Sequence, residues 1–269
     1  MAKIKLPKIN PGAIALMPSF ILVFIFVYVF IAYTIRISLS ENWMPGKQDF
    51  SMPPEWYGTY YKLFNAYRFQ ADLRNTIIFT ILFLILSVVA GLLLAIAVSN
   101  MVKSRVFFRN LFLMPYALSF IVTGVIWRWI FNPVSGVNLL LQYSGISTLY
   151  EKTFGEPLQP AWMTSATVFG NLNGLLEKVV PGGETLQAQM GVPIAMLPVI
   201  FAASWQLCGF AMAMFLAGLT GIPHELREAA AIDRASGFRY YRSIALPALI
   251  PMAVTAAVIL TSTSLKIFD

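Results

Sequence analysis

The densest group of charged side chains in this 269-residue sequence lies in residues 225–251, ELREAAAIDRASGFRYYRSIALPALIP. The block carries three acids and four arginines, although only 12% of the whole chain is charged, and apolar segments flank it on both sides. Acids and arginines at this density can form ion pairs with a partner surface. The block could therefore supply docking chemistry, and the elements that present these charges must be predicted next.

The local sequence of this block predicts two short helical segments joined by a turn. Pro223 suits the first turn of a helix, and acidic residues near a helix N-terminus are favourable. We expect a helix over residues 225–235, a turn at Gly237 and a second helical segment over residues 238–244. Two interpretations stay open from composition: a rigid docking handle, or a connector whose charges only enforce topology.

Catalytic chemistry of the usual kinds is poorly supported by the residues present. The chain has one histidine, His224, and one cysteine, Cys208, so neither a His-based triad with a metal set nor a disulfide can be assembled. The apolar segments carry no carboxylates for a proton relay, and the sequence contains no P-loop. We expect neither catalytic residues nor a metal site.

Composition places the chain among helical membrane proteins. It is 58% hydrophobic, with a mean hydropathy of +0.71. Several apolar stretches approach or exceed the roughly 20 residues that cross a bilayer. We predict an all-α polytopic membrane protein, one transmembrane domain over residues 1–269. Its expected spans are residues 13–35, 76–100, 111–131, 192–221 and 248–265.

The placement of lysine and arginine predicts the orientation. Three segments together hold ten basic residues against three acids. The loops over residues 36–74 and 128–190 are nearly balanced, and their basic residues do not form the single face expected of a nucleic-acid binder. The positive-rich side is expected to be cytoplasmic, which places the N-terminus and the charged block inside. The ten basic residues are Lys3, Lys5, Lys8, Lys103, Arg105, Arg109, Arg227, Arg234, Arg239 and Arg242.

Two further patterns concern packing and the loops. Small residues recur every four positions at Gly209, Ala213, Ala217 and Gly221, which allows a neighbouring helix to approach closely. Residues 132–190 lack a convincing span and are expected to form an insertion on the outer face. Within it, apolar residues over 168–180 recur at helical spacing and predict an amphipathic helix along the outer interface or against a partner.

The charged block resembles the EAA loop of binding-protein-dependent ABC importer permeases, whose pattern reads E-A-A-x3-G-x9-I-x-L-P. Its spacing is met in full across residues 223–247, with one departure: the usual glycine falls on Arg234. We expect Gly237 to take over the flexible turn. The resemblance implies that the loop is a coupling element for an ATPase. Its coupling residues would be Glu228, Ala229, Ala230, Asp233, Arg234, Gly237, Ile244, Leu246 and Pro247.

The resemblance covers nearly the whole chain. The segments FFRNLFLMPYALSFIVTGVIWRWIFNP, SWQLCGFAMAMFLAGL and LKIFD are similar to the carbohydrate branch of these permeases, specifically its first-permease type. Within that branch the similarity is greatest to permeases for glucose, mannose and glucosides. The family implies a type I importer bundle, which continues past FD with a T-x-G-G-P turn and a final span. A sixth span is therefore expected beyond Asp269.

The same resemblance implies partners and a mechanism. In this family two permeases pair, and each EAA loop docks on a cytoplasmic ATPase dimer. The chain itself is expected to bind no cofactor, because ATP and Mg²⁺ belong to the ATPase. An extracytoplasmic sugar-binding protein would deliver the solute. The implied location is the cytoplasmic (inner) membrane of a bacterium or archaeon, and the implied function is import of a monosaccharide or small glucoside.

The path of the sugar is predicted from residue types. Aromatic rings and uncharged hydrogen-bonding groups suit neutral sugars, and the alternative for each such residue is packing, or bonding back to its own helix. The candidates are Trp205, Gln206, Thr255, Thr261 and Ser262. Two other functions stay open: an ABC permease for a polyol, an oligosaccharide or a glycerol-phosphate-type solute, and, less well supported, a membrane-embedded enzyme.

Overall fold

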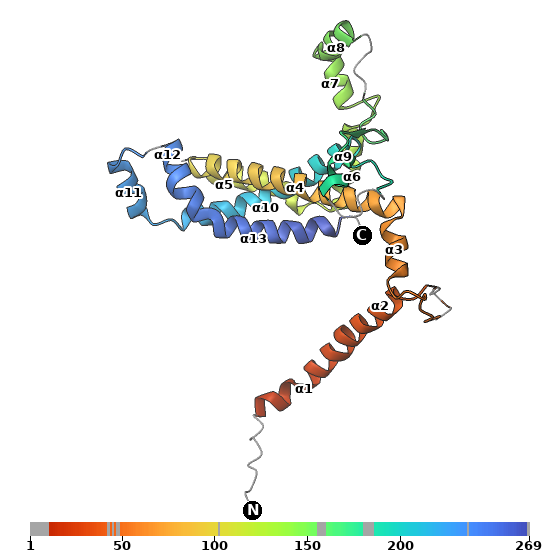
Figure 1. The fold of residues 1–269 in the computed structure, drawn as a ribbon. Helices are drawn as coiled ribbons and strands as arrows, with labels where there is room; N and C mark the ends of the chain where they lie inside the picture. The colour runs from red at the N-terminus through yellow and green to blue at the C-terminus, as the bar shows by residue number, and fades with distance from the viewer. Residues whose placement is uncertain are drawn as a thin grey trace, which may run out of the picture. The chain divides into compact units, whose positions relative to one another are not determined.

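The structure, a computed structural model, describes residues 11–41, 44, 46, 49–101, 103–154, 160–179, 186–235 and 237–267. The chain divides into two compact units, residues 1–70 and residues 71–269, and each is treated by itself. Figure 1 traces the chain and labels its main elements. Residues 268 and 269, at the end of the LKIFD segment, lie outside the described residues.

The first unit contains one long apolar helix. It is built from α1 (Pro11–Val23), a π-helical stretch η1 (Phe24–Val29) and α2 (Phe30–Ser38). Residues Ala15–Ser38 are long and apolar enough to cross a membrane. Near the end of this helix, the Arg36 guanidinium donates from Nη2 to the Phe50 carbonyl at 2.6 Å. This hydrogen bond joins the following loop to the end of the helix. The short helix α3 (Gly58–Phe64) and the first residues of α4 complete the unit.

The second unit is organised around α10 (Met196–Thr220), the most buried of the long helices. Its neighbours include α5 (Arg105–Leu113), α6 (Phe120–Ile130) and α13 (Leu246–Leu265). Figure 1 shows α4 (Tyr67–Ser99), α10 and α13 running side by side. Apolar residues that bind these helices together are almost fully buried, among them Phe79, Phe83, Ala211, Met212, Leu249 and Leu260.

Close helix packing depends on Gly209, which the small-residue spacing predicts, and on Gly91. A Cβ atom on Gly209 would lie 2.1 Å from the Phe112 carbonyl oxygen, so α10 meets the backbone of α5 there. On α4, a Cβ on Gly91 would lie 2.5 Å from the Ala211 Cβ. Real Cβ atoms do not approach other atoms this closely, so both positions require glycine for the observed helix separation.

Four of the five predicted spans correspond to single helices. The span over residues 13–35 is found at Ala15–Ser38, and that over 76–100 extends to Tyr67–Ser99. The span over 192–221 begins later, at Met196, because Val192–Pro193 forms strand β2. The span over 248–265 begins earlier, at Phe238, because α12 (Phe238–Tyr240) and the π-helical η4 (Tyr241–Ala245) continue into α13.

The predicted third span, residues 111–131, is wrong as a single helix. The chain instead forms α5, a 3₁₀ turn η2 (Met114–Ala117) and α6, and the two parts are bent by 97°. Pro115 has no N–H to continue the α-helical bonding, so the helix tightens and ends. Leu118 is extended, and the Ser119 hydroxyl then caps α6 by accepting from the Ile121 N–H at 3.2 Å.

The insertion over residues 132–190 is built from short elements: α7 (Val137–Tyr143), α8 (Ile146–Phe154), β1 (Val168–Phe169) and α9 (Asn173–Val179). The amphipathic helix predicted over 168–180 is therefore wrong in its first part, and residue 180 lies outside the described residues. Strand β1 pairs antiparallel with β2 instead, and Gly170 turns the chain at φ +81°. The two paired strands are only two residues long. A segment this short cannot show the alternation of apolar and polar residues by which a strand is predicted.

The glycine contact between α10 and α5 generates a stability prediction. We expect Gly209→Ala to lower the free energy of unfolding by about 1–3 kcal/mol, because the new methyl group overlaps the Phe112 carbonyl. The melting temperature of the purified protein in detergent measures this. Gly124→Ala in α6 is the matched control, because a Cβ there meets nothing within 4 Å. Equal melting temperatures for the two variants would contradict the close approach.

Candidate functional site

The coupling-type loop begins with the helix α11 (His224–Ile232), close to the predicted position. Glu225 lies in its first turn, where a carboxylate is favourable. His224 Nδ1 lies 3.1 Å from Glu228 Oε1, one helical turn further on, and both side chains are mostly exposed. Glu228 thus stands on the open face of α11, where a partner can reach its carboxylate.

The C-terminus of α11 is closed by a Schellman arrangement centred on Arg234. Asp233 is the C-cap residue, and Arg234 follows with φ +53°, in the left-handed region. The Ala235 N–H donates to the Ala230 carbonyl at 2.8 Å, and the Arg234 N–H donates to the Ala231 carbonyl at 3.2 Å. These are the two hydrogen bonds of the Schellman motif, in which glycine usually takes the left-handed position.

The structure therefore revises the expected role of Gly237. Gly237 does turn the chain, with φ +61°, at the start of α12. However, Arg234, at the position where the pattern has glycine, itself adopts a left-handed conformation, at a cost of roughly 1–2 kcal/mol for a residue with a side chain. The chain is therefore reversed between α11 and α12 by two turns, one at Arg234 and one at Gly237.

The three residues of the EAA triplet lie in different surroundings. Glu228 and Ala229 are exposed, whereas Ala230 is buried and packs with Ala235 against the core of the second unit. Consecutive helix residues are separated by about 100°, so the three side chains cannot share one face. Glu228 and Ala229 can thus meet a partner, while Ala230 anchors α11 to its own chain.

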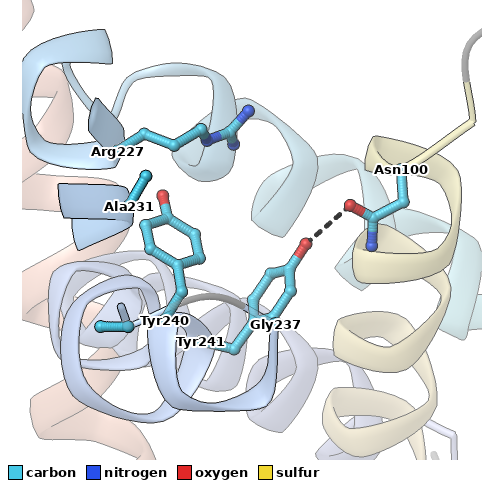
Figure 2. A pocket seen from close by; sticks show the side chains of 7 residues that line it. Asn100, Arg227, Ala231, Gly237, Tyr240 and Tyr241 are labelled. Carbon is cyan, nitrogen blue, oxygen red and sulfur yellow. Dashed lines mark hydrogen bonds between the residues drawn. The ribbon is translucent and has the colours of Figure 1, made fainter. Parts of the chain in front are cut away.

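The back of the loop is joined to the membrane helices by two tyrosines. We call α11, α12 and the turn between them the bracket. Across it, the Arg227 guanidinium lies 5.5 Å from the centroid of the buried Tyr240 ring, which is a cation–π contact. The Tyr241 hydroxyl donates to Asn100 Oδ1 at 3.0 Å, just after α4 ends (Figure 2). Together with Ala231 and Gly237 these residues line a cavity of about 300 Å³. Sequence reasoning did not single out Asn100, Tyr240 or Tyr241.

The last three residues of the pattern form the entry to α13. Ile244 is half-buried and packs against the core, while Leu246 and Pro247 occupy the first turn of α13. Pro247 has no N–H to donate, and it lies just after the π-helical η4, where the hydrogen-bonding pattern of the helix changes. The pattern I-x-L-P therefore describes how the bracket is joined to a membrane helix.

Among the predicted substrate-path residues, Trp205 and Gln206 lie at the bend between α5 and α6. Trp205 packs edge-on against Trp127, with ring centroids 5.5 Å apart, and lines an apolar cavity of about 460 Å³ together with Pro115, Leu118 and Cys208. The buried Gln206 donates from Nε2 to the Leu118 carbonyl at 2.7 Å. Gln206 thus satisfies a backbone group that the break in the helix leaves open.

The three candidates on α13 are arranged differently. The Thr255 hydroxyl donates to the Pro251 carbonyl at 2.9 Å, and the Thr261 hydroxyl donates to the Ala257 carbonyl at 2.7 Å. Both bonds lie within the helix itself, and Ser262 is exposed. Among the described residues no group of three or more His, Cys, Asp or Glu side chains could hold a metal ion.

The fold and the loop define a class of protein: a polytopic helical membrane subunit with a polar bracket between two apolar helices. Residues 87–268 match the family described as binding-protein-dependent transport system inner membrane component, and the chain belongs to this family. It is therefore a multi-pass inner-membrane permease subunit of an ABC importer, and a transporter subunit rather than an enzyme, as the sequence pattern predicts.

Individual relatives support this assignment. A probable ABC transporter permease of Pyrococcus horikoshii is 32% identical over 94% of this chain and 74% of its own length. A xylose/arabinose import permease of Haloferax volcanii is 31% identical over 93% of this chain and 67% of its own length. Other relatives are named for sn-glycerol-3-phosphate or for trehalose and maltose.

A solved structure shares the fold. One chain of a bacterial ABC transporter involved in alginate import aligns with a TM-score of 0.61 and 17% identity. The alignment covers 94% of this chain and 73% of that one. This likeness confirms the predicted type I permease bundle.

The left-handed arginine generates a prediction for the loop. We expect Arg234→Gly to stabilise the C-terminus of α11 by about 1 kcal/mol, because glycine adopts this conformation without a Cβ clash. Hydrogen exchange of the Ala235 amide, which is bonded to Ala230, should slow roughly fivefold. Arg239→Gly, within α12, is the control and should not slow it. Faster exchange in Arg234→Gly would contradict the Schellman arrangement.

Proposed function

We propose that this chain is the transmembrane permease subunit of an ATP-driven, binding-protein-dependent sugar importer that moves a monosaccharide or small glucoside into the cytoplasm. The observation that carries the proposal is the bracket of α11 and α12, which follows the family's coupling pattern and presents Glu228 on an open helix face. The sugar assignment is supported by the relative named for xylose and arabinose.

The proposed partners follow from the family and from the architecture. A second permease would complete the membrane bundle, and a cytoplasmic ATPase dimer, which holds ATP and Mg²⁺, would receive α11. A periplasmic or other extracytoplasmic binding protein would deliver the sugar, in keeping with the alginate transporter solved with such a protein bound. The N-terminus and the coupling loop lie in the cytoplasm in this proposal, in agreement with the distribution of basic residues.

The mechanism is a population shift between two packings of the bundle. Closure of the ATPase dimer on ATP would displace α11, and the contacts of Ala230, Tyr240 and Tyr241 would pass that displacement to the membrane helices. ATP acts only through its different affinity for the two states. Asp233, Arg234 and Gly237 shape the loop, whereas Glu228 and Ala229 meet the ATPase.

The solute is tested on the binding protein. Labelled monosaccharides and glucosides should bind the cognate external binding protein, and the reconstituted importer should accumulate the same sugar in an ATP-dependent manner. Preferential binding of a polyol, an oligosaccharide or a glycerol phosphate would replace the sugar proposal with one of those alternatives. Transport without any ATPase subunit would contradict the importer itself.

The coupling role of Glu228 generates a second test. The family resemblance implies that Glu228 meets a basic residue of the ATPase. We therefore expect Glu228→Lys to insert normally but to abolish most of the ATPase activity stimulated by sugar-loaded binding protein, because the lysine would repel that residue. Glu225→Lys, on the same exposed helix, is the charge-matched control and should retain activity. Normal stimulated activity in Glu228→Lys would rule out this role.

The cavity beside Trp205 generates a prediction for the sugar path. We expect Trp205→Ala to raise the sugar concentration needed for half-maximal transport roughly three- to tenfold, because one aromatic surface is lost. Thr255→Val is the control, because the Thr255 hydroxyl is engaged within its own helix. Transport assays in proteoliposomes measure both variants. Unchanged half-saturation in Trp205→Ala would remove this residue from the path.

A further inference from the structure

A groove with a basic end and an apolar end lies between α5 and α10. Arg105, Arg109 and Leu113 follow one face of α5, four residues apart, and contribute to a cavity of about 380 Å³. Its other wall comes from α10, where Ala213, Ala217 and Thr220 are also four or three residues apart. We name this feature, defined by these six residues, the basic groove.

The basic groove continues toward the coupling loop. An adjoining cavity of about 430 Å³ shares Arg105 and Thr220 with it and adds His224 and Arg227. Its lining is polar, in contrast to the alanine and leucine wall near Ala213. Polarity thus changes along one continuous surface, from the end that carries α11 toward the interior of the bundle.

The positive charge of the basic groove has no acidic counterpart within the described residues. The ion pairs among the described residues are Lys62 with Glu41 and His224 with Glu228. The guanidinium groups of Arg105, Arg109 and Arg227 therefore have no carboxylate of a described residue within 4 Å. Arg105 is half-buried, which makes an unpaired charge more costly. It also begins α5, a helix with no acid in its first turn, where the helix dipole favours an anion.

The depth of the basic groove matches the boundary of a bilayer. The spanning helices α4 and α10 end at Ser99 and Thr220, at the same end of the bundle as α11 (Figure 1). Arginines at this level reach the phosphate layer, whereas Leu113 and Ala213, one to two turns deeper, face the hydrocarbon region. Basic pockets of this kind between membrane helices suit anionic lipid headgroups.

We propose that the basic groove binds one acidic phospholipid. Its phosphate would pair with Arg105 and Arg109, and one acyl chain would lie along α10 over Ala213 and Ala217. A free phosphate would leave the apolar wall uncovered, and a zwitterionic lipid would bring its own cation beside the arginines. Because Arg227 lines both the adjoining cavity and the cavity behind α11, the lipid headgroup lies beside the coupling loop.

The experiment measures retained lipid on the full chain, purified with the subunits that accompany it, in nanodiscs of equal phosphatidylglycerol and phosphatidylcholine. Native mass spectrometry after release should find phosphatidylglycerol retained on the wild type. The double substitution Arg105→Gln and Arg109→Gln should reduce this retention roughly tenfold or more, because each arginine near an anionic headgroup contributes to binding. Retention that is unchanged in this variant overturns the proposal.

Two matched variants distinguish lipid binding in the basic groove from a general effect of positive charge on the protein. Arg239→Gln with Arg242→Gln removes the same charge from exposed residues outside the groove and should retain the lipid. Ala213→Leu with Ala217→Leu keeps the arginines but fills the apolar wall and should lose it. This variant also tests the proposal if the arginine variant does not fold. Equal loss in the Arg239 and Arg242 variant, or full retention in the leucine variant, overturns the site.

Two further outcomes decide between occupants. If inorganic phosphate displaces phosphatidylglycerol, or if phosphatidylcholine is retained equally, an acidic lipid is not the specific occupant. The variant Ala217→Cys is labelled with a thiol reagent in lipid-free detergent, with and without the accompanying subunits. If an accompanying subunit prevents the labelling, that subunit covers the groove and the lipid proposal fails. None of these results depends on which solute is transported, so the proposed function is tested separately.

Discussion

The constraint on which the structure depends is that backbone groups in hydrocarbon must find their hydrogen-bond partners within the protein. Long helices satisfy it automatically, and α4, α10 and α13 do so. The bend between α5 and α6 breaks the pattern, and the protein repairs it locally: Ser119 caps the new helix, and Gln206 donates to the Leu118 carbonyl. A polar residue in the middle of α10 is therefore explained by a backbone group on another helix.

In the coupling-type loop, likewise, a small number of contacts joins the polar bracket to the apolar helix bundle. Ala230 is buried because its side chain is small enough for α11 to lie against the core. The aromatic ring of Tyr240 fills the space beneath Arg227. The carboxylates of Glu225 and Glu228 remain exposed, so one short helix contacts its own chain through Ala230 and Arg227 and presents acidic groups outward.

Hydropathy and residue spacing predicted the class, the helical architecture and the bracket, because these depend on composition and periodicity. They did not predict the 97° bend, although Pro115 and Ser119 are its local signals, because the surrounding residues are uniformly apolar. Arg234 in a left-handed conformation was not foreseen, since that geometry is imposed by the helix end rather than by the residue. The contact of Asn100 with Tyr241 joins residues 141 positions apart, which no local pattern can reveal.

That contact has a mechanical consequence. A single exposed hydrogen bond contributes only about 1 kcal/mol, so it can break and re-form within a transport cycle at little cost. The chain joins α11 covalently to α10 before it and, through α12 and η4, to α13 after it, whereas the tyrosine hydroxyl reaches α4 by a separate route. A displacement of the loop would thus reach α4 as well as α10 and α13 while the bond holds, and would no longer reach α4 through this bond after it breaks. This hydrogen bond would therefore determine whether α4 follows the loop.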